Sequence, residues 1–344
     1  AFPIHPTLDR SLSPREAARI QTFPDKIKFS GTRRMQCILV GNAVPPLMAK
    51  HIAKSIHKHI YEDSLGNGVD LFLKKYMRLE KNVQMPLWST IDDQSKLNFV
   101  DLFSGAGGIS LGFKNAGYNC VLSADNDKSV EFTHKMNFPD ETFIENDLSL
   151  DNTKNRIKDI VGKDLDILLG GPPCQGFSIY GNRRFLNTQT IEYDPHKDPR
   201  NKLIFTFLDY VKLLNPKWVF MENVPGIKSL DNGYFLKELI KEIKSMGYEN
   251  CEYKIINVAD YGVPQKRKRL ILIANRTEQL IPWPKPKFYE NPKDWQQPYR
   301  TVGEVITDLS VEQNLAIKNI TNHEPMKHSD ILLNRFSYIE EGMK

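Results

Sequence analysis

Cys174 stands where a reactive cysteine would be expected in an α/β protein. It lies in the run GGPPCQGFS (170–178), directly after the apolar segment LDILL. Loops at the carboxyl ends of parallel strands hold the active sites of such proteins. A cysteine fixed there beside a ligand cleft is a candidate nucleophile. A buried structural cysteine is the alternative, and we expect that role for Cys37, Cys120 and Cys251.

An acid and an amide end a second apolar run. The segment WVFMENVPG (218–226) places Glu222 and Asn223 directly after the apolar residues WVFM. Desolvation of a carboxyl group at the end of a buried strand raises its pKa and lets it donate a proton. The sequence therefore predicts a proton donor at Glu222.

Arginines alternate with lysines before a third apolar run. In DYGVPQKRKRLILIAN (260–275), Gln265, Arg267 and Arg269 precede the apolar residues. Side chains alternate across a strand, so an arginine at the start of a strand can point inward at the site. A solvated basic turn is the alternative if this segment is taken alone.

A glycine-rich turn connects a predicted strand to a predicted helix. FVDLFSGAGGISLGF places Gly105, Gly107 and Gly108 there, and a second strand ends in Asp125. Glycines let a ligand approach the backbone, and an acidic residue about twenty positions later typically binds a ribose. The pattern predicts a nucleoside-containing cofactor, with NAD or a purely structural turn as alternatives. The chain lacks both GxGxxG and GxxxxGK[ST] at this turn.

These segments belong to strands that alternate with helices. We expect a doubly wound, mostly parallel α/β sheet covered on both faces. The predicted strands are 96–103, 121–125, 165–171, 217–224 and 270–275. Four helices are predicted: one that begins near 109, one over 127–138, and two near 200–214 and 233–246.

The flanking regions differ from this core. In residues 1–62, Ser13, Pro14 and Glu16 have the pattern of a capping box that starts a helix. An apolar stripe predicts a second helix over 44–60. We expect a linker at 63–96 and the catalytic domain at 97–281. From 282 to 344, proline and aromatic residues followed by a weakly patterned tail predict the start of a second, small and incomplete domain.

Composition narrows the class of protein. The chain has 344 residues, of which 40% are hydrophobic and 26% charged. No apolar run approaches the ~18 residues of a membrane span, and no leader pattern opens the chain. The four cysteines form no CxxC pair, which argues against a zinc ribbon and favours a reducing cytoplasm. The first sixty residues are distinctly basic, which is compatible with a polyanionic partner or with a solvated surface.

Taken together, these segments resemble the DNA (cytosine-5) methyltransferases. DLFSGAGG, PPCQGFS, MENV and QKRKR occur in the family's order, and the match covers most of 1–60 and 97–276. The resemblance implies the S-adenosylmethionine-dependent methyltransferase fold. Two segments, RSLSPREAARIQTFPD (10–25) and VGNAVPP (40–46), come last in most of the family but first here. The chain therefore resembles a circularly permuted member, with 63–96 as the bridge.

The resemblance leaves one part of the family without a counterpart. The target-recognition domain normally lies between the QKRKR segment and the RSLSPREAAR segment. The sequence shows no counterpart of its middle, so recognition would be supplied by a second polypeptide, lost, or trimmed away. We expect a second polypeptide, double-stranded DNA as the other partner, and no metal or membrane.

The family mechanism implies roles for the residues above. Cys174 would add to C6 of a flipped cytosine, Glu222 would hold and protonate N3, and C5 would take the methyl of S-adenosylmethionine. Asn223 would fix the loop, and Arg267 would contact the ring carbonyl or orient Glu222. The implied catalytic set is Pro173, Cys174, Gln175, Glu222, Asn223 and Arg267.

The resemblance also implies binding residues. Those for the cofactor are Phe103, Ser104, Gly105, Gly107, Gly108, Asp125, Asn126, Asp147, Leu148, Leu203, Asn42 and Val44. Asn126 departs from the large apolar residue that many relatives carry, which puts one adenine contact in doubt. Those for DNA are Arg183, Arg184, Arg269, Arg10 and Arg15, although Arg15 could instead be buried in an ion pair.

Two other functions stay open at this point. A transfer-RNA cytosine-5 methyltransferase shares the same segments and lacks a sequence-reading domain. A catalytically silent DNA-binding subunit would be expected to lose Cys174 or Glu222, and both are present. We expect a prokaryotic cytoplasmic enzyme, associated with the nucleoid, of a restriction-modification system.

Overall fold

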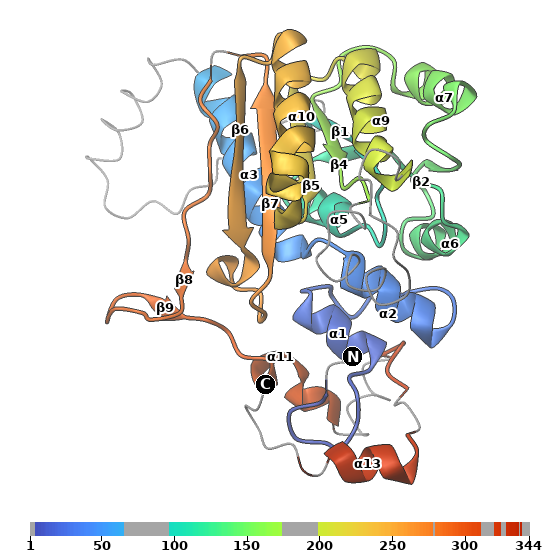
Figure 1. The fold of residues 1–344 in the computed structure, drawn as a ribbon, viewed down its shortest axis with the longest axis vertical. Coiled ribbons are helices and arrows are strands. Elements are labelled where there is room, and N and C mark those ends of the chain that lie inside the picture. The colour runs from blue at the N-terminus through green and yellow to red at the C-terminus, as the bar shows by residue number, and fades with distance from the viewer. Residues whose placement is uncertain are drawn as a thin grey trace, which may run out of the picture.

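The centre of the molecule is a seven-stranded sheet (Figure 1). The computed structural model describes residues 4–64, 96–173, 199–277, 279–310, 320–324, 328–336 and 338. Within them the strand order is β3-β2-β1-β4-β5-β7-β6, and only β7 runs antiparallel to its neighbours. The strands are β1 (Asn98–Leu102), β2 (Asn119–Asp125), β3 (Phe143–Glu145), β4 (Ile167–Gly170), β5 (Trp218–Asn223), β6 (Asn250–Asn257) and β7 (Lys268–Asn275). The predicted mostly parallel α/β sheet is confirmed.

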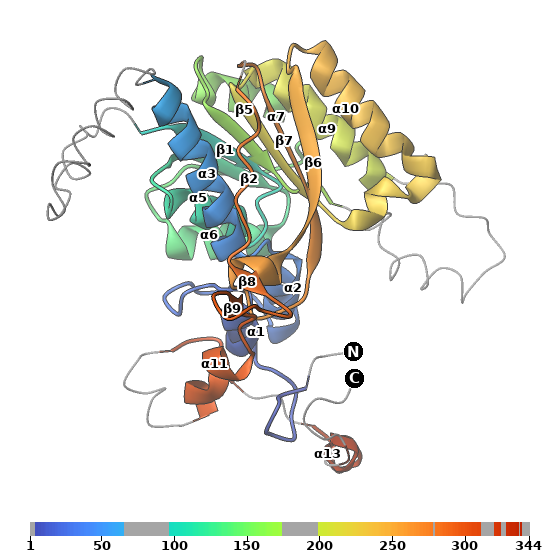
Figure 2. The same ribbon diagram turned by 90° about the vertical axis from the view of Figure 1, so that its left-hand side faces the viewer.

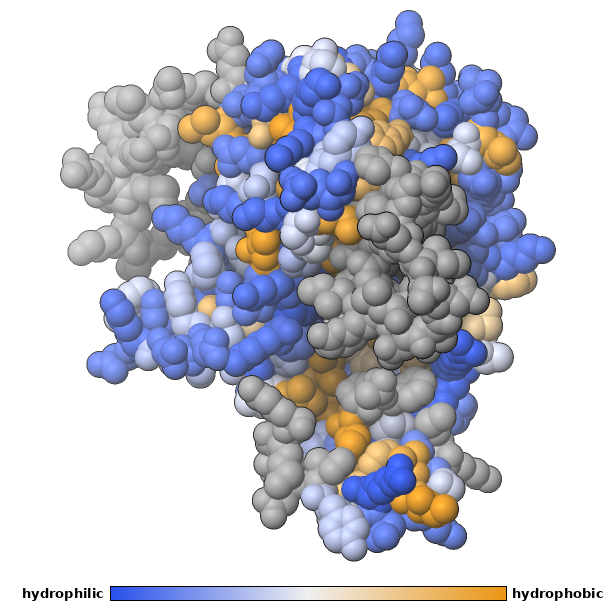
Figure 3. Space-filling view, in the orientation of Figure 1, coloured by the Kyte–Doolittle hydropathy of each residue, from blue (hydrophilic) through white to orange (hydrophobic). Residues whose placement is uncertain are grey.

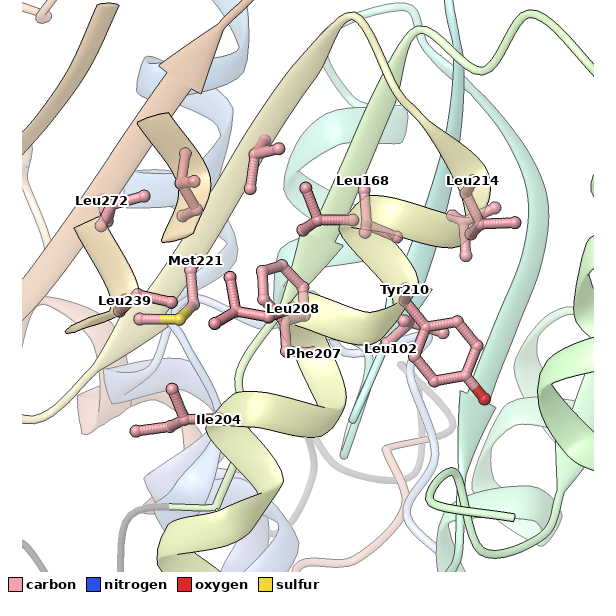
Figure 4. Close-up of a cluster of buried hydrophobic side chains, with 14 of the residues drawn as sticks. Leu102, Leu168, Ile204, Phe207, Leu208, Tyr210, Leu214, Met221, Leu239 and Leu272 are labelled. Carbon is pink, nitrogen blue, oxygen red and sulfur yellow. The ribbon is translucent and has the colours of Figure 1, made fainter. Parts of the chain in front are cut away.

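Helices cover both faces of this sheet, as Figure 2 shows. On one face, α7 (Asp151–Val161), α9 (Pro199–Leu214) and α10 (Tyr234–Ser245) pack on the strands through one apolar cluster, part of which is drawn in Figure 4. On the other face, α3 (Pro46–Ser64) and α5 (Gly108–Lys114) form a second cluster. Because both faces are covered, every residue of β4 and β5 is buried.

A third apolar cluster lies below the sheet and joins α1 (Pro14–Ile20), α2 (Arg33–Asn42), α5 and α6 (Lys128–Asn137). The predicted capping box of α1 is present: Ser13 accepts a hydrogen bond from the Glu16 backbone, and Glu16 accepts one from the Ser13 backbone. The sequence did not predict α2, α7, β3 or β6. The reason for β6 is plain, because it is an edge strand with mixed burial and has no continuous apolar run.

The lower part of the molecule is small. It contains β8 (Phe288–Tyr289), β9 (Gln297–Pro298), α11 (Gly303–Ile306) and α13 (Asp330–Phe336). Two chain regions far apart in sequence meet there, because Ser11 contacts His328 and Ser13 contacts His323, the latter pair at 2.8 Å. Hydrophilic residues cover most of the described surface over the sheet, and hydrophobic ones gather lower down (Figure 3). Among the described residues, no helix is long and apolar enough to cross a membrane.

The seam between α3 and α5 is unusually close. A Cβ added to Gly112 would lie 2.4 Å from the Cβ of Ala49 and 2.7 Å from the carbonyl oxygen of Pro46. A Cβ added to Gly108 would lie 2.0 Å from the carbonyl oxygen of Val44. Residues 46–64 are therefore an integral layer of the sheet domain, pressed against the helix that follows the glycine-rich turn.

Gly112→Ala is expected to destabilise the protein, although alanine ordinarily favours a helix. The added methyl group would overlap α3, and overpacking of this kind costs about 1–3 kcal/mol or more. The matched control is Gly41→Ala in α2, where an added Cβ meets nothing within 4 Å and stability should rise by up to about 1 kcal/mol. Urea unfolding of both variants checks this. Equal stability of the two variants would contradict the close seam.

Candidate active site

The loops that carry the predicted residues meet at one end of the sheet, where the parallel strands finish. The Ser104 N–H donates to the Ala124 carbonyl at 3.1 Å, which ties the β1 loop to β2. The Gly171 N–H donates to the Leu102 carbonyl at 3.3 Å, and the Asn223 amide reaches the Pro172 carbonyl at 3.4 Å. The ends of β2, β1, β4 and β5 are thus connected loop to loop.

The glycine-rich turn leaves its backbone open. Gly105 and Gly107 have φ of +52° and +75°, a region that glycine enters without strain. Phe103 has φ of +56°, which is costly for a bulky residue and is held by its packing on the core. A Cβ on Gly105 would meet nothing within 4 Å, so a ligand can approach the chain there.

Asp125 lies beside this turn, as the sequence predicts. Its Oδ2 accepts the Gly105 N–H at 2.9 Å, and its Oδ1 accepts the Asp127 N–H at 3.2 Å. Burial raises the pKa of Asp125, and the backbone donors lower it in part. Each carboxylate oxygen keeps a second lone pair, so the group can still accept hydrogen bonds from the hydroxyls of a ribose.

The remaining predicted cofactor residues line the same edge. The Asn146 N–H donates to the Asp125 carbonyl at 3.1 Å, which brings Asp147 next to Asp125. Asp147 and Asn126 are exposed, whereas Leu148 is buried and its carbonyl accepts the Tyr210 hydroxyl at 3.0 Å. Among the described residues, the buried Ser104 Oγ has no hydrogen-bond partner. A polar ligand at this turn would satisfy it.

Two further predicted cofactor residues come from the N-terminal segment, and one comes from α9. Asn42 is exposed at the end of α2, and Val44 is buried against the start of α5. Leu203 is half-buried in the first turns of α9. These positions, with the open glycine turn and the Asp125 carboxylate, suit a nucleoside cofactor.

Glu222 is buried and paired with an arginine. It is 9% exposed, and its Oε1 lies 2.7 Å from Nε of Arg269. Burial raises the pKa of Glu222, while Arg269 and then Arg267 lower it in part. A Cβ on Gly171 would lie 3.5 Å from Oε2 of Glu222 and 4.0 Å from the Phe103 carbonyl oxygen. The carboxyl group is thus one small residue away from the glycine-rich turn.

The two arginines have different hydrogen-bond partners in the structure. From the sequence, Arg267 was expected to contact the ring carbonyl or to orient Glu222, and Arg269 to bind DNA. In the structure Arg269 pairs with Glu222, and Arg267 donates to the Gly41 carbonyl at 2.7 Å. Both side chains lie on one side of the strand, as alternation requires, while Lys266 and Lys268 are exposed. The register of β7 against β5 decides which of the two arginines pairs with Glu222.

The rest of the predicted catalytic set lies at the same edge or beyond the described residues. Asn223 is buried, and its Oδ1 accepts the Val224 N–H at 2.8 Å. Pro173 is half-buried at the end of the β4 loop. Four predicted residues lie outside the described part of the chain: Cys174, Gln175, Arg183 and Arg184.

The three described cysteines fit the structural role that we expected for them. Cys37, Cys120 and Cys251 are half-buried free thiols. Burial raises the pKa of Cys120 and of Cys251 to about 12 and that of Cys37 less strongly. A thiol that stays protonated is a poor nucleophile.

The N-terminal arginines assigned to DNA have protein partners instead. Arg15 is fully buried, and its guanidinium donates to the carbonyls of Ile27 and Thr321 at 2.6 and 2.9 Å. Arg10 makes two hydrogen bonds to Glu16, at 2.8 and 2.6 Å. Arg15 is therefore buried, as the alternative expected, but among the described residues its guanidinium donates to backbone carbonyls rather than to the carboxylate of an ion pair. The ion pair with Glu16 therefore holds Arg10 against the first turn of α1.

Asp101 is a buried carboxyl group that the sequence analysis missed. It lies on β1, is 0% exposed, and its Oδ2 accepts the Ser110 hydroxyl at 2.5 Å. The N-cap of α5, Gly107, offers no side-chain cap. Asp101 caps the first turn of α5 from the strand in its place. Desolvation raises the pKa of Asp101 to about 7.

Asp101→Asn is expected to alter how stability depends on pH. The folded protein keeps the Asp101 proton up to about pH 7, whereas the unfolded chain loses it near 3.8. Stability from this group is therefore lost as the pH rises between these values, by up to about 4 kcal/mol. The variant does not titrate, so its stability relative to wild type should rise from pH 4 to pH 7 and then level off. Urea unfolding at several pH values measures it, and parallel curves would contradict it.

Several known proteins are similar to this chain in sequence. The model of the family described as C-5 cytosine-specific DNA methylase matches residues 1–58 and 97–343. The chain is 36% identical over 251 residues to the Type II methyltransferase M1.HphI of Haemophilus parahaemolyticus, covering 72% of this chain and 62% of the relative. It is 35% identical over 276 residues to the Type II methyltransferase M.DdeI of Desulfomicrobium norvegicum, covering 72% and 61%. The chain thus spans about three fifths of the length of these relatives.

Solved structures show a partial likeness. A putative DNA modification methyltransferase encoded within a prophage (E. coli) matches with a TM-score of 0.42 and 30% identity, over 52% of this chain and 47% of that one. The Entamoeba histolytica methyltransferase EhMeth matches with a TM-score of 0.43 and 22% identity, over 58% and 62%.

Proposed function

Because the chain belongs to the family of C-5 cytosine-specific DNA methylases, we propose that it transfers a methyl group from S-adenosylmethionine to C5 of cytosine in duplex DNA. One observation carries the proposal. The buried Glu222, paired with Arg269, lies across Gly171 from the glycine-rich turn at Phe103. A proton donor and a nucleoside-binding turn so close together suit methyl transfer to a base.

The chain's own residues supply a nucleophile and an acid. The Cys174 thiolate adds to C6 of cytosine, and Glu222 places a proton on N3, so that C5 becomes an enamine carbon. S-adenosylmethionine, held at the Gly105–Gly107 turn and Asp125, would supply an electrophilic methyl group to C5, with S-adenosylhomocysteine as the leaving group. A base would then remove the C5 proton, the N3 proton would return to the Glu222 carboxylate, and the Cys174 thiolate would leave from C6. Covalent addition divides one difficult step into easier ones.

Arg269 serves this acid directly. A carboxyl group buried without a cation would hold its proton too tightly to exchange it near neutral pH. The arginine lowers that pKa in part and fixes the carboxyl group in one orientation. Arg269 is therefore assigned here to the site rather than to DNA.

The cofactor would lie along the ends of β1, β2 and β3. Asp125 would accept the ribose hydroxyls, Asp147 the adenine amino group, and the Gly105–Gly107 turn would admit the backbone approach. The target base must leave the duplex to reach this edge, at a cost of a few kcal/mol. Arg183 and Arg184 would meet phosphates, as the sequence predicts.

The wider context is part of the proposal. The named relatives are Type II methyltransferases, which supports a role in a prokaryotic restriction-modification system. Residues 1–62 would be the permuted segment that completes the catalytic domain, and the tight α3–α5 seam supports this. A second polypeptide for target recognition stays a prediction, because no described contact addresses it.

Transfer of tritiated methyl from S-adenosylmethionine to duplex DNA tests the proposal, with transfer RNA as the parallel substrate. We expect label in DNA, recovered as 5-methylcytosine after digestion to nucleosides. Label in transfer RNA alone would move the substrate to RNA. Cofactor binding without transfer to either would leave the alternative of a silent subunit, and candidate partner chains would then be added to the assay.

A further inference from the structure

Two amide side chains, those of the buried Gln21 and the half-buried Gln265, connect residues 265–269 to the N-terminal helices. Gln265 Nε2 donates to Gln21 Oε1 at 2.9 Å, and Gln21 Nε2 donates to the Val40 carbonyl at 3.1 Å. Gln21 is only 4% exposed. It ends α1, so one side chain links three parts of the fold: α1, the last turn of α2, and the lead-in to β7.

A second link runs parallel to this bridge. Arg267, two residues after Gln265, donates to the Gly41 carbonyl at 2.7 Å, one residue after Val40. The last carbonyls of a helix lack partners within the helix and carry the negative end of its dipole, which suits a guanidinium group. Figures 1 and 2 show the same arrangement, with the lower end of β7 beside α1 and α2.

The bridge lies close to the reactive groups without belonging to them. Arg269 follows Arg267 by two residues, and its Nε lies 2.7 Å from Oε1 of Glu222. On the other side, Gly41 leads to Asn42 and Val44, and the Val44 carbonyl abuts the start of α5 at Gly108. Both segments that the bridge joins therefore end at the proposed site, one at its acid and the other at its cofactor turn.

We propose that Gln21 and Gln265 are positioning residues, whose amide bridge holds the β7 lead-in at the end of α2 and so fixes Arg269 against Glu222. The proposal rests on the proposed function for its kinetic consequence. An amide suits this place because Gln21 must accept one hydrogen bond and donate another. Methionine at position 21 would remove the acceptor of the Gln265 amide and one of the two donors to the Val40 carbonyl, which would keep the Ala43 N–H at 3.3 Å. The start of β7 would then lose its tie to α2.

The test uses Gln21→Met, Gln265→Met and the double variant, which keep side-chain length. Gln36→Met is the matched control, because Gln36 also donates to one carbonyl, that of Gly31, but lies away from the site. Two measurements are made on each full-length chain. The first is backbone hydrogen exchange, by mass spectrometry, over 38–43 and 265–270. The second is the single-turnover rate of methyl transfer as a function of pH, together with cofactor affinity.

Exchange should increase in both segments in either single variant, because each segment loses its tie to the other. Methyl transfer should slow by about 10- to 100-fold, the scale of a small misplacement of a reacting group, with cofactor affinity within about 3-fold of wild type. The pH limb that reports Glu222 should move upward, since Arg269 no longer holds the carboxylate. The double variant should be little slower than the worse single one.

Two outcomes would overturn the proposal. The first is an increase in hydrogen exchange that is confined to the mutated segment, or no increase at all, as expected for Gln36→Met. Either result would show that the bridge does not tie the two segments together. Slower transfer with an unmoved pH limb and additive single effects would show a merely structural role. If the wild-type chain transfers no methyl to DNA or RNA, the proposed function has failed, and the exchange measurement alone then decides on the bridge.

Discussion

Glu222→Gln is expected to slow methyl transfer by about 10²- to 10⁴-fold, the usual contribution of a positioned proton donor. The amide keeps the shape of the carboxyl group and can donate a hydrogen bond, but it has no acidic proton to transfer to N3. Cofactor affinity should change little, because Asp125 and the glycine-rich turn hold that ligand from other strands. Single-turnover transfer to DNA and a binding titration with S-adenosylmethionine measure the two effects separately.

The pH profile sharpens this prediction. Burial raises the pKa of Glu222, so the protonated form persists to higher pH than for an exposed glutamate. The wild-type rate should fall as the pH rises through that raised value, and the fall should be missing in Glu222→Gln. Glu290→Gln is the control, because Glu290 is an exposed carboxylate that pairs with Lys266. Equal rates of methyl transfer for the two variants would show that Glu222 takes no part in the reaction.

Cys174→Ala is expected to have the largest effect on transfer. Without the thiolate, C6 receives no nucleophile and C5 never becomes an enamine carbon. Removal of a nucleophile typically lowers the turnover number by about 10⁵-fold or more. Cofactor binding should persist, because the described cofactor residues do not include this side chain. The measurement is label transfer to DNA, with a binding titration to show that the variant is folded.

A covalent adduct gives a second measurement on the same variant. Duplex DNA that carries 5-fluorocytosine, supplied together with S-adenosylmethionine, blocks the final step, since a base cannot remove fluorine from C5 as it removes the proton. Wild-type protein should then remain attached to DNA under denaturing conditions, and Cys174→Ala should not. Cys251→Ala is the matched control, because burial raises the pKa of that thiol to about 12 and its loss should leave the adduct intact. Adduct formation by Cys174→Ala would assign the nucleophile to another residue.

Local sequence was enough to predict much of the sheet domain and to propose its chemistry. Buried strands such as β4 and β5 are continuous apolar runs, and a parallel sheet must be covered on both faces, so the run itself predicts the layer. The capping box at Ser13 involves residues three apart, so the sequence contains all of it. The acidic residue after β2 and the glycine-rich turn after β1 likewise depend on strand ends alone, and they meet as expected.

The sequence alone did not determine how distant segments pair with one another. The choice between Arg267 and Arg269 depends on how antiparallel β7 pairs with β5, where Asn223 lies opposite Leu270. Two arginines on one side of a strand are equivalent until that register is set. The same is true of the amide bridge, because Gln21 and Gln265 are far apart in the chain and no local pattern pairs them.

Packing decided the remaining differences. Arg15 is basic and lies in a basic segment, so its sequence suggested a phosphate, yet its guanidinium is buried among backbone carbonyls. Asp101 is hidden in an apolar strand, and its capping of α5 arises only when the helix folds back over β1. Residue types and strand ends therefore determined what chemistry this chain can attempt. The tertiary structure decided which charged groups are exposed and which are paired inside, because burial and register depend on residues that are distant in the chain.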